Sequence, residues 1–390
     1  MNRKYIMELR KFVSPEIVCG VDARLLIGKY MVNFGAERPM IVTDTGASGQ
    51  KWFADIISEI STKVEKITIF SSITPNPKDF EVMAGTKEYL ENKCDLLIAI
   101  GGGSPIDCAK CIAVLSSNGG QISDYYGVDR VMEPGPPLIC IPSTAGSSAD
   151  VSQFAIILDS EQSVKKAIIS KMVVPDLALI DPVPLLTEDS YLAACTGLDA
   201  LTHAIEAYVS NAGSNLTDVW ALEAIKLISG NLENAISSGA EIENVYPVML
   251  GSLQAGLAFS NASLGAVHAM AHSLGGLLNL AHGECNAILL GPVIEENFDC
   301  AAEQYTNIAE AMGIDVSKRN KNEVKSELIS RISLFRRNLG IRDRIEIKNY
   351  SIYEPRLISS ALLDPCMVTN PKAFTATEVS TIYGKIINPI

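Results

Sequence analysis

The sequence predicts an α/β domain built on a parallel sheet, followed by an all-α domain. In the first half of the chain, short runs rich in β-branched residues alternate with amphipathic helical stretches, which is typical of helices covering a parallel sheet. After Asp181-Pro182, long segments with helical periodicity follow one another and strand signals become sparse. We therefore expect two domains, residues 1–185 and residues 186–390.

The expected elements of the first domain are short buried strands with helices between them. Their apolar runs are only four to six residues long and end in turn-forming residues, which favours strands over helices. We expect strands at 39–44, 66–70, 95–100, 138–142 and 177–180, and helices at 51–61 and 79–92.

The expected elements of the second domain are helices separated by Gly, Pro or Asn. Apolar residues recur at helical spacing in each segment, so each has one face to bury. We expect helices at 191–209, 217–229, 245–261, 267–278 and 301–312.

Composition excludes several classes of protein. Of the 390 residues, 47% are hydrophobic and 20% charged, as in ordinary globular domains, and the net charge of −13 argues against nucleic acid or an anionic membrane surface as a partner. We find no apolar run long enough to span a bilayer, and the charged residues Lys4, Glu8, Arg10 and Lys11 do not suit a signal peptide. We therefore expect a cytoplasmic protein without a membrane or nucleic-acid partner.

The nine cysteines are an odd number and are spread through apolar segments, as expected for reduced, buried thiols in the cytoplasm. Cys108-x-x-Cys111 has the spacing of a redox or metal pair. Without a second such pair, we favour two small residues packed on a helix.

A glycine turn in the first domain has the features of a phosphate-binding loop. The expected strand at 95–100 runs into Gly101-Gly102-Gly103-Ser104-Pro105, and a helix continues through Asp107 to Leu115. Glycines allow a ligand to approach the backbone closely, and the free amides at the start of a helix favour a phosphate. Taken alone, the pattern fits a plain strand-to-helix turn equally well, since it matches neither G-x-G-x-x-G nor the Walker motif.

Two further signals favour a nucleotide ligand. The expected strand at 138–142 leads into Ser143-Thr144-Ala145-Gly146-Ser147-Ser148, a small, hydroxyl-rich turn. Asp44 ends the expected strand at 39–43, where a carboxylate can accept hydrogen bonds from ribose hydroxyls and repel a 2′-phosphate. Together these signals predict an adenine dinucleotide, NAD rather than NADP.

All four histidines of the chain lie within one stretch of the second domain. Their order is Asp199-x-x-x-His203, His268-x-x-x-His272 and His282-Gly283. Residues i and i+4 share a helix face, so two helices can each direct a pair of side chains to one point, with His282 closing the ring. Imidazole nitrogens and a carboxylate suit a divalent transition metal. A chance arrangement of capping and packing residues is a poor explanation for five candidate ligands at this spacing.

These motifs resemble the iron-containing (group III) alcohol dehydrogenases. The matching segments occur in family order over nearly the whole chain. They are Gly101-Gly-Gly-Ser-Pro-Ile-Asp107, Pro142-Ser-Thr-Ala-Gly-Ser147, Thr196-Gly-Leu-Asp-Ala-Leu-Thr-His-Ala-Ile-Glu-Ala-Tyr208, His268-Ala-Met-Ala-His272-Ser-Leu-Gly275 and His282-Gly-Glu-Cys-Asn-Ala-Ile-Leu-Leu290. The resemblance implies a dehydroquinate synthase-like architecture, with the active site in the cleft between a nucleotide-binding domain and a helical metal domain.

The resemblance also implies roles for particular residues. The metal ligands fall on Asp199, His203, His268 and His282, with Fe²⁺ as the expected metal and Zn²⁺ or another divalent ion as the alternative. His272 falls beside the nicotinamide and substrate, where an imidazole of near-neutral pKa can relay a proton. The cofactor contacts fall on a larger set: Asp44, Asn76, Gly102, Gly103, Ser104, Asp107, Thr144, Ser147 and Lys165.

The expected function is therefore NAD-dependent interconversion of a small primary alcohol and its aldehyde. Family relatives commonly form dimers or larger assemblies, so we expect a homo-oligomer. Two alternatives stay open. One is a lyase of the dehydroquinate synthase type, which would need Arg and Lys residues for an anionic substrate, and the other is a non-catalytic sensor of metal or nucleotide.

Overall fold

The computed structural model describes residues 11–162, 164–237, 239–278 and 280–389. These residues form two compact units, one within residues 13–188 and the other within residues 189–389 together with residues 11 and 12. The first unit is an α/β structure and the second is mainly helical, as the change of sequence pattern predicts.

The α/β unit is built on a six-stranded sheet in which every neighbouring pair is parallel. Across the sheet the strands are β1 (Glu16–Cys19), β9 (Leu177–Ile180), β6 (Leu138–Pro142), β4 (Leu96–Gly101), β2 (Pro39–Thr43) and β3 (Thr68–Phe70). The five predicted strands are present, and β1 is an additional edge strand whose partly exposed residues gave no apolar run.

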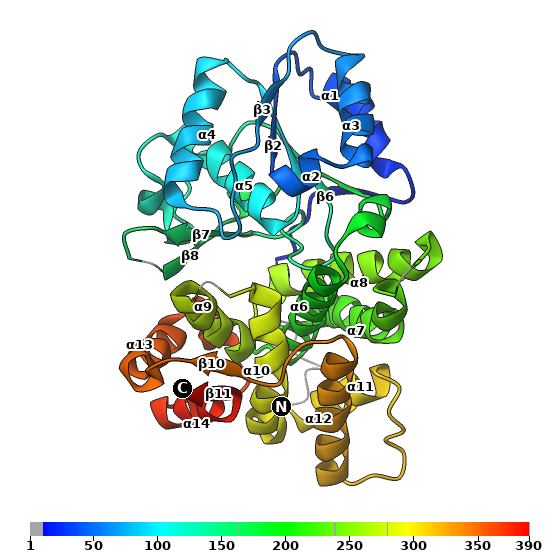
Figure 1. Cartoon of the computed structure of the whole chain (residues 1–390), viewed down its shortest axis with the longest axis vertical. Coiled ribbons are helices and arrows are strands. Elements are labelled where there is room, and N and C mark those ends of the chain that lie inside the picture. The colour runs from blue at the N-terminus through cyan, green and yellow to red at the C-terminus, as the bar shows by residue number, and fades with distance from the viewer. Residues whose placement is uncertain (1–10, 163, 238, 279, 390) are drawn as a thin grey trace. The chain divides into compact units, whose positions relative to one another are not determined.

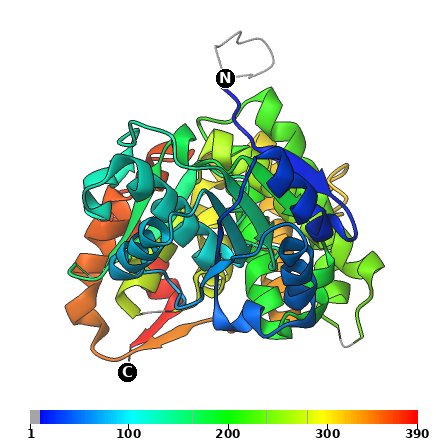
Figure 2. The ribbon, with the colours of Figure 1, turned by 90° about the horizontal axis from the view of Figure 1, so that it is seen from above.

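Helices cover both faces of this sheet (Figures 1 and 2). On one face lie α1 (Ile27–Asn33) and α3 (Lys51–Ser61), and on the other lie α4 (Asp79–Glu91) and α5 (Gly103–Asn118). Successive side chains of a strand point to opposite faces of the sheet, so one strand contributes residues to two hydrophobic cores. In β4, Leu97 and Ala99 join the core of α4 and α5, whereas Ile98 and Ile100 join that of α1 and α3.

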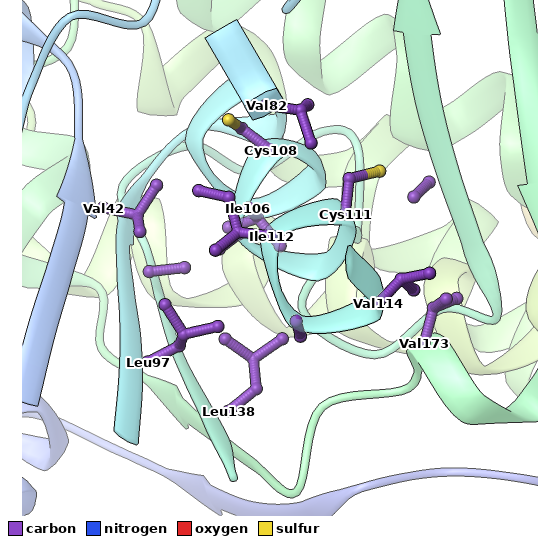
Figure 3. Packing of buried hydrophobic residues seen from close by; sticks show 14 of the residues in the cluster. Val42, Val82, Leu97, Ile106, Cys108, Cys111, Ile112, Val114, Leu138 and Val173 are labelled. Atoms are coloured by element: carbon purple, nitrogen blue, oxygen red, sulfur yellow. The ribbon is translucent and has the colours of Figure 1, made fainter. Parts of the chain in front are cut away.

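The core around α5 contains the Cys108-x-x-Cys111 pair. Figure 3 shows both cysteines among Val82, Ile112 and Val114. Burial raises the pKa of each thiol, which keeps both protonated and unreactive. The packing interpretation of this pair agrees with that environment.

A second sheet in this unit was not anticipated. It has the strand order β5 (Gly127–Val128), β8 (Val164–Ile169) and β7 (Phe154–Asp159), with β7 and β8 antiparallel. The inward residues of β7, Ala155 and Ile157, belong to the α5 core, so this hairpin packs against that core.

The helical unit begins at Asp189, whose carboxylate caps the first helix. Its helices are α6 (Ser190–Val209), α7 (Asn215–Ala235), α8 (Ile242–Ala262), α9 (Ala266–Leu278), α10 (His282–Asn297), α11 (Ala302–Ala311), α12 (Lys321–Asn338), α13 (Tyr350–Leu363) and α14 (Ala376–Ile386). The five predicted helices are all present. Pro247 and Pro292 lie inside helices rather than between them. A short parallel pair, β10 (Ile345–Ile347) and β11 (Ile387–Pro389), is added to the helices.

The remaining elements are a one-turn helix, α2 (Thr45–Ser48), and short 3-10 turns: η2 (Ala23–Leu26), η3 (Ile122–Tyr125), η4 (Lys171–Val173), η5 (Val183–Thr187), η6 (Phe298–Cys300) and η7 (Pro365–Thr369). Within the described ranges, no helix has both the length and the apolar character needed to cross a membrane.

Candidate functional site

Helix α6 carries the first two predicted metal ligands on its buried face. Asp199 and His203 are one turn apart, and both side chains are buried. The Nε2 atom of His203 lies 3.9 Å from Oδ1 of Asp199. The helix therefore presents a carboxylate oxygen and an imidazole nitrogen to one point, as the i, i+4 spacing predicts.

The other two predicted ligands come from α9 and from the first residue of α10. The Nε2 atom of His268 lies 3.4 Å from Oδ1 of Asp199, and that of His282 lies 3.8 Å from the same oxygen. The donor atoms of Asp199, His268 and His282 all lie within 4.8 Å of one another. The ring of His203 stacks on that of His268, with their centroids 4.5 Å apart. The structure thus gathers the donor atoms of three predicted ligands, and the fourth, Nε2 of His203, lies beside them, 3.9 Å from Asp199.

A glycine sets the position of His282. A Cβ atom at Gly283 would come within 2.1 Å of the carbonyl oxygen of Cys195, on the turn of α6 before Asp199. Real Cβ atoms essentially never approach a backbone oxygen so closely. Helices α6 and α10 therefore meet backbone to backbone beside the ligand cluster, and this contact brings His282 to Asp199.

The electrostatics of the cluster favour a positive charge at its centre. Burial disfavours a charged Asp199, but the neighbouring His203, His282 and His268 hold its pKa well below the ordinary value. Burial likewise lowers the pKa of His268, but hydrogen bonds to Asp199 and Glu206 outweigh it and raise that pKa to about 9. In the metal-free protein, protons on imidazole therefore supply the charge that the carboxylates require.

Asn286 gives a second indication of the same kind. Its Nδ2 atom donates to Oδ1 of Asp199 at 2.6 Å and lies 3.1 Å from Nε2 of His268 and 3.2 Å from Nε2 of His282. Three of the candidate ligand atoms thus gather around one amide nitrogen. With three imidazole nitrogens and one carboxylate oxygen as donors, these residues fit a divalent transition metal ion.

His272 lies outside this donor cluster. Its ring is parallel to that of His282 with centroids 5.1 Å apart, and its Nδ1 atom lies 2.8 Å from Oδ2 of Asp364. Oδ1 of Asp364 accepts a hydrogen bond from the backbone N–H of Cys366 at 2.8 Å. Although burial opposes ionisation of Asp364, His272 lowers its pKa, so the carboxylate is charged and Nδ1 of His272 carries the hydrogen.

Two residues of this region escaped the sequence analysis. Glu206 lies on the ligand face of α6, two turns after Asp199, and Asn286 lies one turn after His282. Both residues lie at helical spacing from a predicted ligand. An acid or an amide at that spacing predicts no particular partner until the helices are packed together.

The predicted phosphate loop lies at the carboxyl end of β4, within the α/β unit. Gly101 has φ of 144°, and a Cβ there would come within 2.8 Å of Pro105. A Cβ at Gly103 would come within 2.8 Å of Oγ of Ser147. The two glycine- and hydroxyl-rich loops therefore touch, and glycine is required where they do.

Asp44 lies at the carboxyl end of the neighbouring strand β2. Its Oδ1 atom accepts hydrogen bonds from the N–H groups of Gly46 at 2.8 Å and Ala47 at 2.9 Å. Its Oδ2 atom would be 3.1 Å from a Cβ at Gly101. The candidate ribose-binding carboxylate and the phosphate loop are thus adjacent at one sheet edge, as expected for a dinucleotide-binding fold.

The other predicted cofactor residues have varied surroundings. Thr144 contacts Gly102, with Cγ2 3.4 Å from a Cβ built there. Asn76 has the left-handed conformation, with φ of 57°. Asp107 is buried and its Oδ2 atom accepts from the N–H of Ile156 at 3.2 Å. Burial raises its pKa to about 6, opposed by Lys110 and more weakly by Lys165. Its observed partners are therefore protein groups, and its contact with a cofactor stays a prediction.

A dinucleotide-binding α/β unit and a helical unit with a three-histidine, one-carboxylate cluster together define a metal-dependent dehydrogenase. Sequence profiles of this class match both units: "Iron-containing alcohol dehydrogenase" over residues 14–182 and "Fe-containing alcohol dehydrogenase family, C-terminal" over residues 193–387. The chain belongs to the iron-containing alcohol dehydrogenase family.

Individual relatives agree with this assignment. The chain is 33% identical to an NAD-dependent methanol dehydrogenase of Bacillus methanolicus, over 95% of this chain and 98% of the relative. It is 32% identical to a 1,3-propanediol dehydrogenase of Klebsiella pneumoniae, over 93% and 95%. A solved 1,3-propanediol oxidoreductase superposes with a TM-score of 0.92 at 31% identity, covering 97% of this chain and 99% of that one. The expected family, fold and oxidoreductase class are confirmed.

Proposed function

We propose that this protein interconverts a small primary alcohol and its aldehyde with NAD, using Fe²⁺ held by Asp199, His203, His268 and His282. The observation that carries the proposal is the approach of three Nε2 atoms to Oδ1 of Asp199, at 3.4, 3.8 and 3.9 Å. Relatives named methanol and propanediol dehydrogenases support a short alcohol as substrate.

When bound, the metal ion would supply a Lewis acid for the alcohol oxygen and NAD would supply an acceptor for the hydride, chemistry that side chains lack. The carboxylate of Asp199 supplies negative charge to the metal site. The imidazoles of His203, His268 and His282 present neutral lone pairs, so the four ligands leave part of the ion's charge available to a substrate oxygen.

His272 is the proposed proton relay. Because Nδ1 carries the hydrogen bonded to Asp364, Nε2 is the nitrogen that can accept a proton from the substrate hydroxyl. In the direction of aldehyde reduction, the same nitrogen returns the proton. Asp364 holds the ring and stabilises the charge that it acquires.

The proposed NAD site lies at the carboxyl ends of strands β2, β4 and β6 of the parallel sheet. Backbone N–H groups of Gly102, Gly103 and Ser104, at the start of α5, suit the pyrophosphate. The carboxylate of Asp44 suits the ribose hydroxyls and disfavours a 2′-phosphate, which selects NAD over NADP. Thr144, Ser147, Asn76, Asp107 and Lys165 complete the proposed contacts.

The distribution of charge favours a dehydrogenase over a lyase with an anionic substrate. The sequence contains no Lys or Arg between Lys226 and Lys318, the stretch that carries His268, His272 and His282. An anionic substrate would lack a counter-ion from these helices. The proposal also includes a cytoplasmic location and a homo-oligomer. The first is supported by nine free thiols, of which six are buried as expected while Cys19 and Cys300 are exposed, and the second by the resemblance to a family whose members commonly form dimers or larger assemblies.

The test is NADH formation by the anaerobically purified, Fe²⁺-loaded protein with a panel of short primary alcohols. We expect turnover with at least one alcohol and with its aldehyde in reverse. A protein that retains metal and binds NAD, yet transfers no hydride with any alcohol or aldehyde, would instead be a sensor. Elemental analysis with activity measured for each divalent ion identifies the metal. His268→Ala is expected to lose both metal and turnover.

A further inference from the structure

Glu206 is a buried carboxylate on the same face of α6 as Asp199 and His203. It is 3% exposed, and its place seven residues after Asp199 puts it two turns along that face. Among the described residues, His268 is its ion-pair partner, at 2.6 Å from Oε2 to Nδ1. A buried carboxylate needs a compensating positive charge. Here the His268 imidazole lies between Glu206 and the proposed metal ligands, with Nδ1 on Glu206 and Nε2 facing Asp199.

The hydrogen bond between Glu206 and His268 fixes the tautomer of the ring. A carboxylate only accepts hydrogen bonds, so Nδ1 of His268 carries a hydrogen, and Nε2, which faces Asp199, is the nitrogen left to bind a metal ion once it gives up its proton. In the opposite tautomer the hydrogen would sit on Nε2 and block a metal ion. A carboxylate behind a ligating imidazole also strengthens the imidazole as a donor.

Glu206 also fixes the start of the helix that carries His268. Its Oε1 atom accepts a hydrogen bond from the N–H of Val267 at 2.7 Å, at the first turn of α9. A Cβ at Gly265 would come within 2.8 Å of the same oxygen, so the chain passes close against this carboxylate. One side chain therefore controls both the position of the helix and the orientation of its ligand.

We propose that Glu206 is a positioning residue for the metal, one that selects the metal-binding tautomer of His268 and supplies the second negative charge of the site. With Asp199, it balances a divalent cation held by helices α6, α9 and α10, none of which contains a Lys or Arg residue. This inference rests on the proposed ligand role of His268.

The variant Glu206→Gln isolates this role. The amide oxygen can still accept from Val267, but the amide nitrogen would then donate to Nδ1 of His268 and favour the hydrogen on Nε2. We expect about 10- to 100-fold weaker binding of Zn²⁺ and Co²⁺, measured by competition with a chromogenic chelator. We also expect shifted visible absorption bands in the Co²⁺ form.

Asn370 provides the matched structural control. Its Oδ1 atom accepts from the N–H of Ala266 at 3.1 Å, so it caps the same end of α9 without contacting His268. Asn370→Ser should lower the melting temperature of metal-free and metal-loaded protein alike and leave metal affinity within about threefold of wild type. Equal loss of affinity in both variants would reduce Glu206 to a helix cap and overturn the proposal.

A second measurement needs no variant of Glu206. In Zn²⁺-loaded wild-type protein with isotope-labelled histidine, the chain offers only four imidazole rings to resolve. The signals that disappear in the His268→Asn variant identify the His268 ring. We expect this ring in the wild-type protein to carry a proton on Nδ1 that is protected from exchange with solvent. A deprotonated or metal-bound Nδ1 on that ring overturns the proposal.

The outcomes separate this inference from the proposed ligand set. If His268→Ala retains full metal affinity, His268 is not a ligand, and the ligand set on which the proposed function rests is wrong. If His268→Ala loses the metal but Glu206→Gln keeps wild-type affinity and cobalt absorption, the ligand set stands and the role of Glu206 alone fails.

Discussion

Gly283 packs against the backbone of Cys195 so closely that a Cβ atom at position 283 would lie 2.1 Å from the Cys195 carbonyl oxygen. His282 precedes Gly283 in the chain, and Asp199 lies one turn after Cys195 on α6. Both are proposed metal ligands. The contact therefore links helix packing directly to the geometry of the metal site: α6 and α10 can approach only where neither has a side chain between them.

Gly283→Ala is predicted to separate these helices. A backbone oxygen cannot rotate away, so the clash must shift α10, with a cost of about 3 kcal/mol or more in the free energy of unfolding. We expect a lower melting temperature and loss of bound metal. The matched control is Gly291→Ala in the same helix, where the nearest atom would be 3.9 Å away and alanine is the better helix former. Wild-type stability and metal content in Gly283→Ala would contradict the packing described here.

The metal-free protein is predicted to lose stability at alkaline pH through His268. Its pKa is raised from 6.5 to about 9, despite burial, by hydrogen bonds to Asp199 and Glu206. A group whose folded pKa lies above its unfolded pKa stabilises the fold fully below the unfolded value. That contribution disappears as pH rises through the folded value. We therefore expect the free energy of unfolding to fall between about pH 6.5 and pH 9.

Denaturant titrations of the chelator-treated protein at several pH values measure this effect. His268→Gln removes the titrating group and serves as the reference for all other ionisations. If wild type and His268→Gln show parallel dependence on pH, the ring is not held protonated by its carboxylate neighbours.

Asp364→Asn is predicted to slow turnover without releasing metal. Asn can keep the contact with the N–H of Cys366 through its oxygen, but its nitrogen would donate to Nδ1 of His272 and place the hydrogen on Nε2. That tautomer cannot accept the substrate proton, so we expect kcat to fall by about 10- to 1000-fold. Steady-state kinetics and metal analysis on the same preparation give both quantities. Unchanged kcat would remove His272 from the proton path.

Helical spacing in the sequence predicted that five candidate ligands gather, because residues four apart share a helix face. The spacing did not separate His272 from the four ligands that the family resemblance implies. It gave no information on Gly283, since no local pattern reveals which distant backbone a glycine will touch. The role of Glu206 could not be predicted for a different reason. The sequence shows only a single acid within an apolar helix, and its partner, the first turn of α9, is identified by the packing of the two helices. The hairpin of β7 and β8 was not predicted because no local pattern shows that Ala155, Ile157 and Ile168 pack against the core around α5.

The charge of Asp44 is predicted to set the preference for NAD over NADP. Asp44→Asn keeps the oxygen that accepts from Gly46 and Ala47, so the turn after β2 should stay in place while the negative charge is removed. A charge beside the ribose repels a 2′-phosphate, and its loss should raise kcat/KM for NADP relative to NAD by about tenfold, equivalent to about 1.4 kcal/mol. Measuring kcat/KM for both cofactors at low and high salt checks the electrostatic origin, because added salt screens an exposed charge and should shrink the difference between variant and wild type. An unchanged ratio at low salt would mean that another group reads the 2′ position.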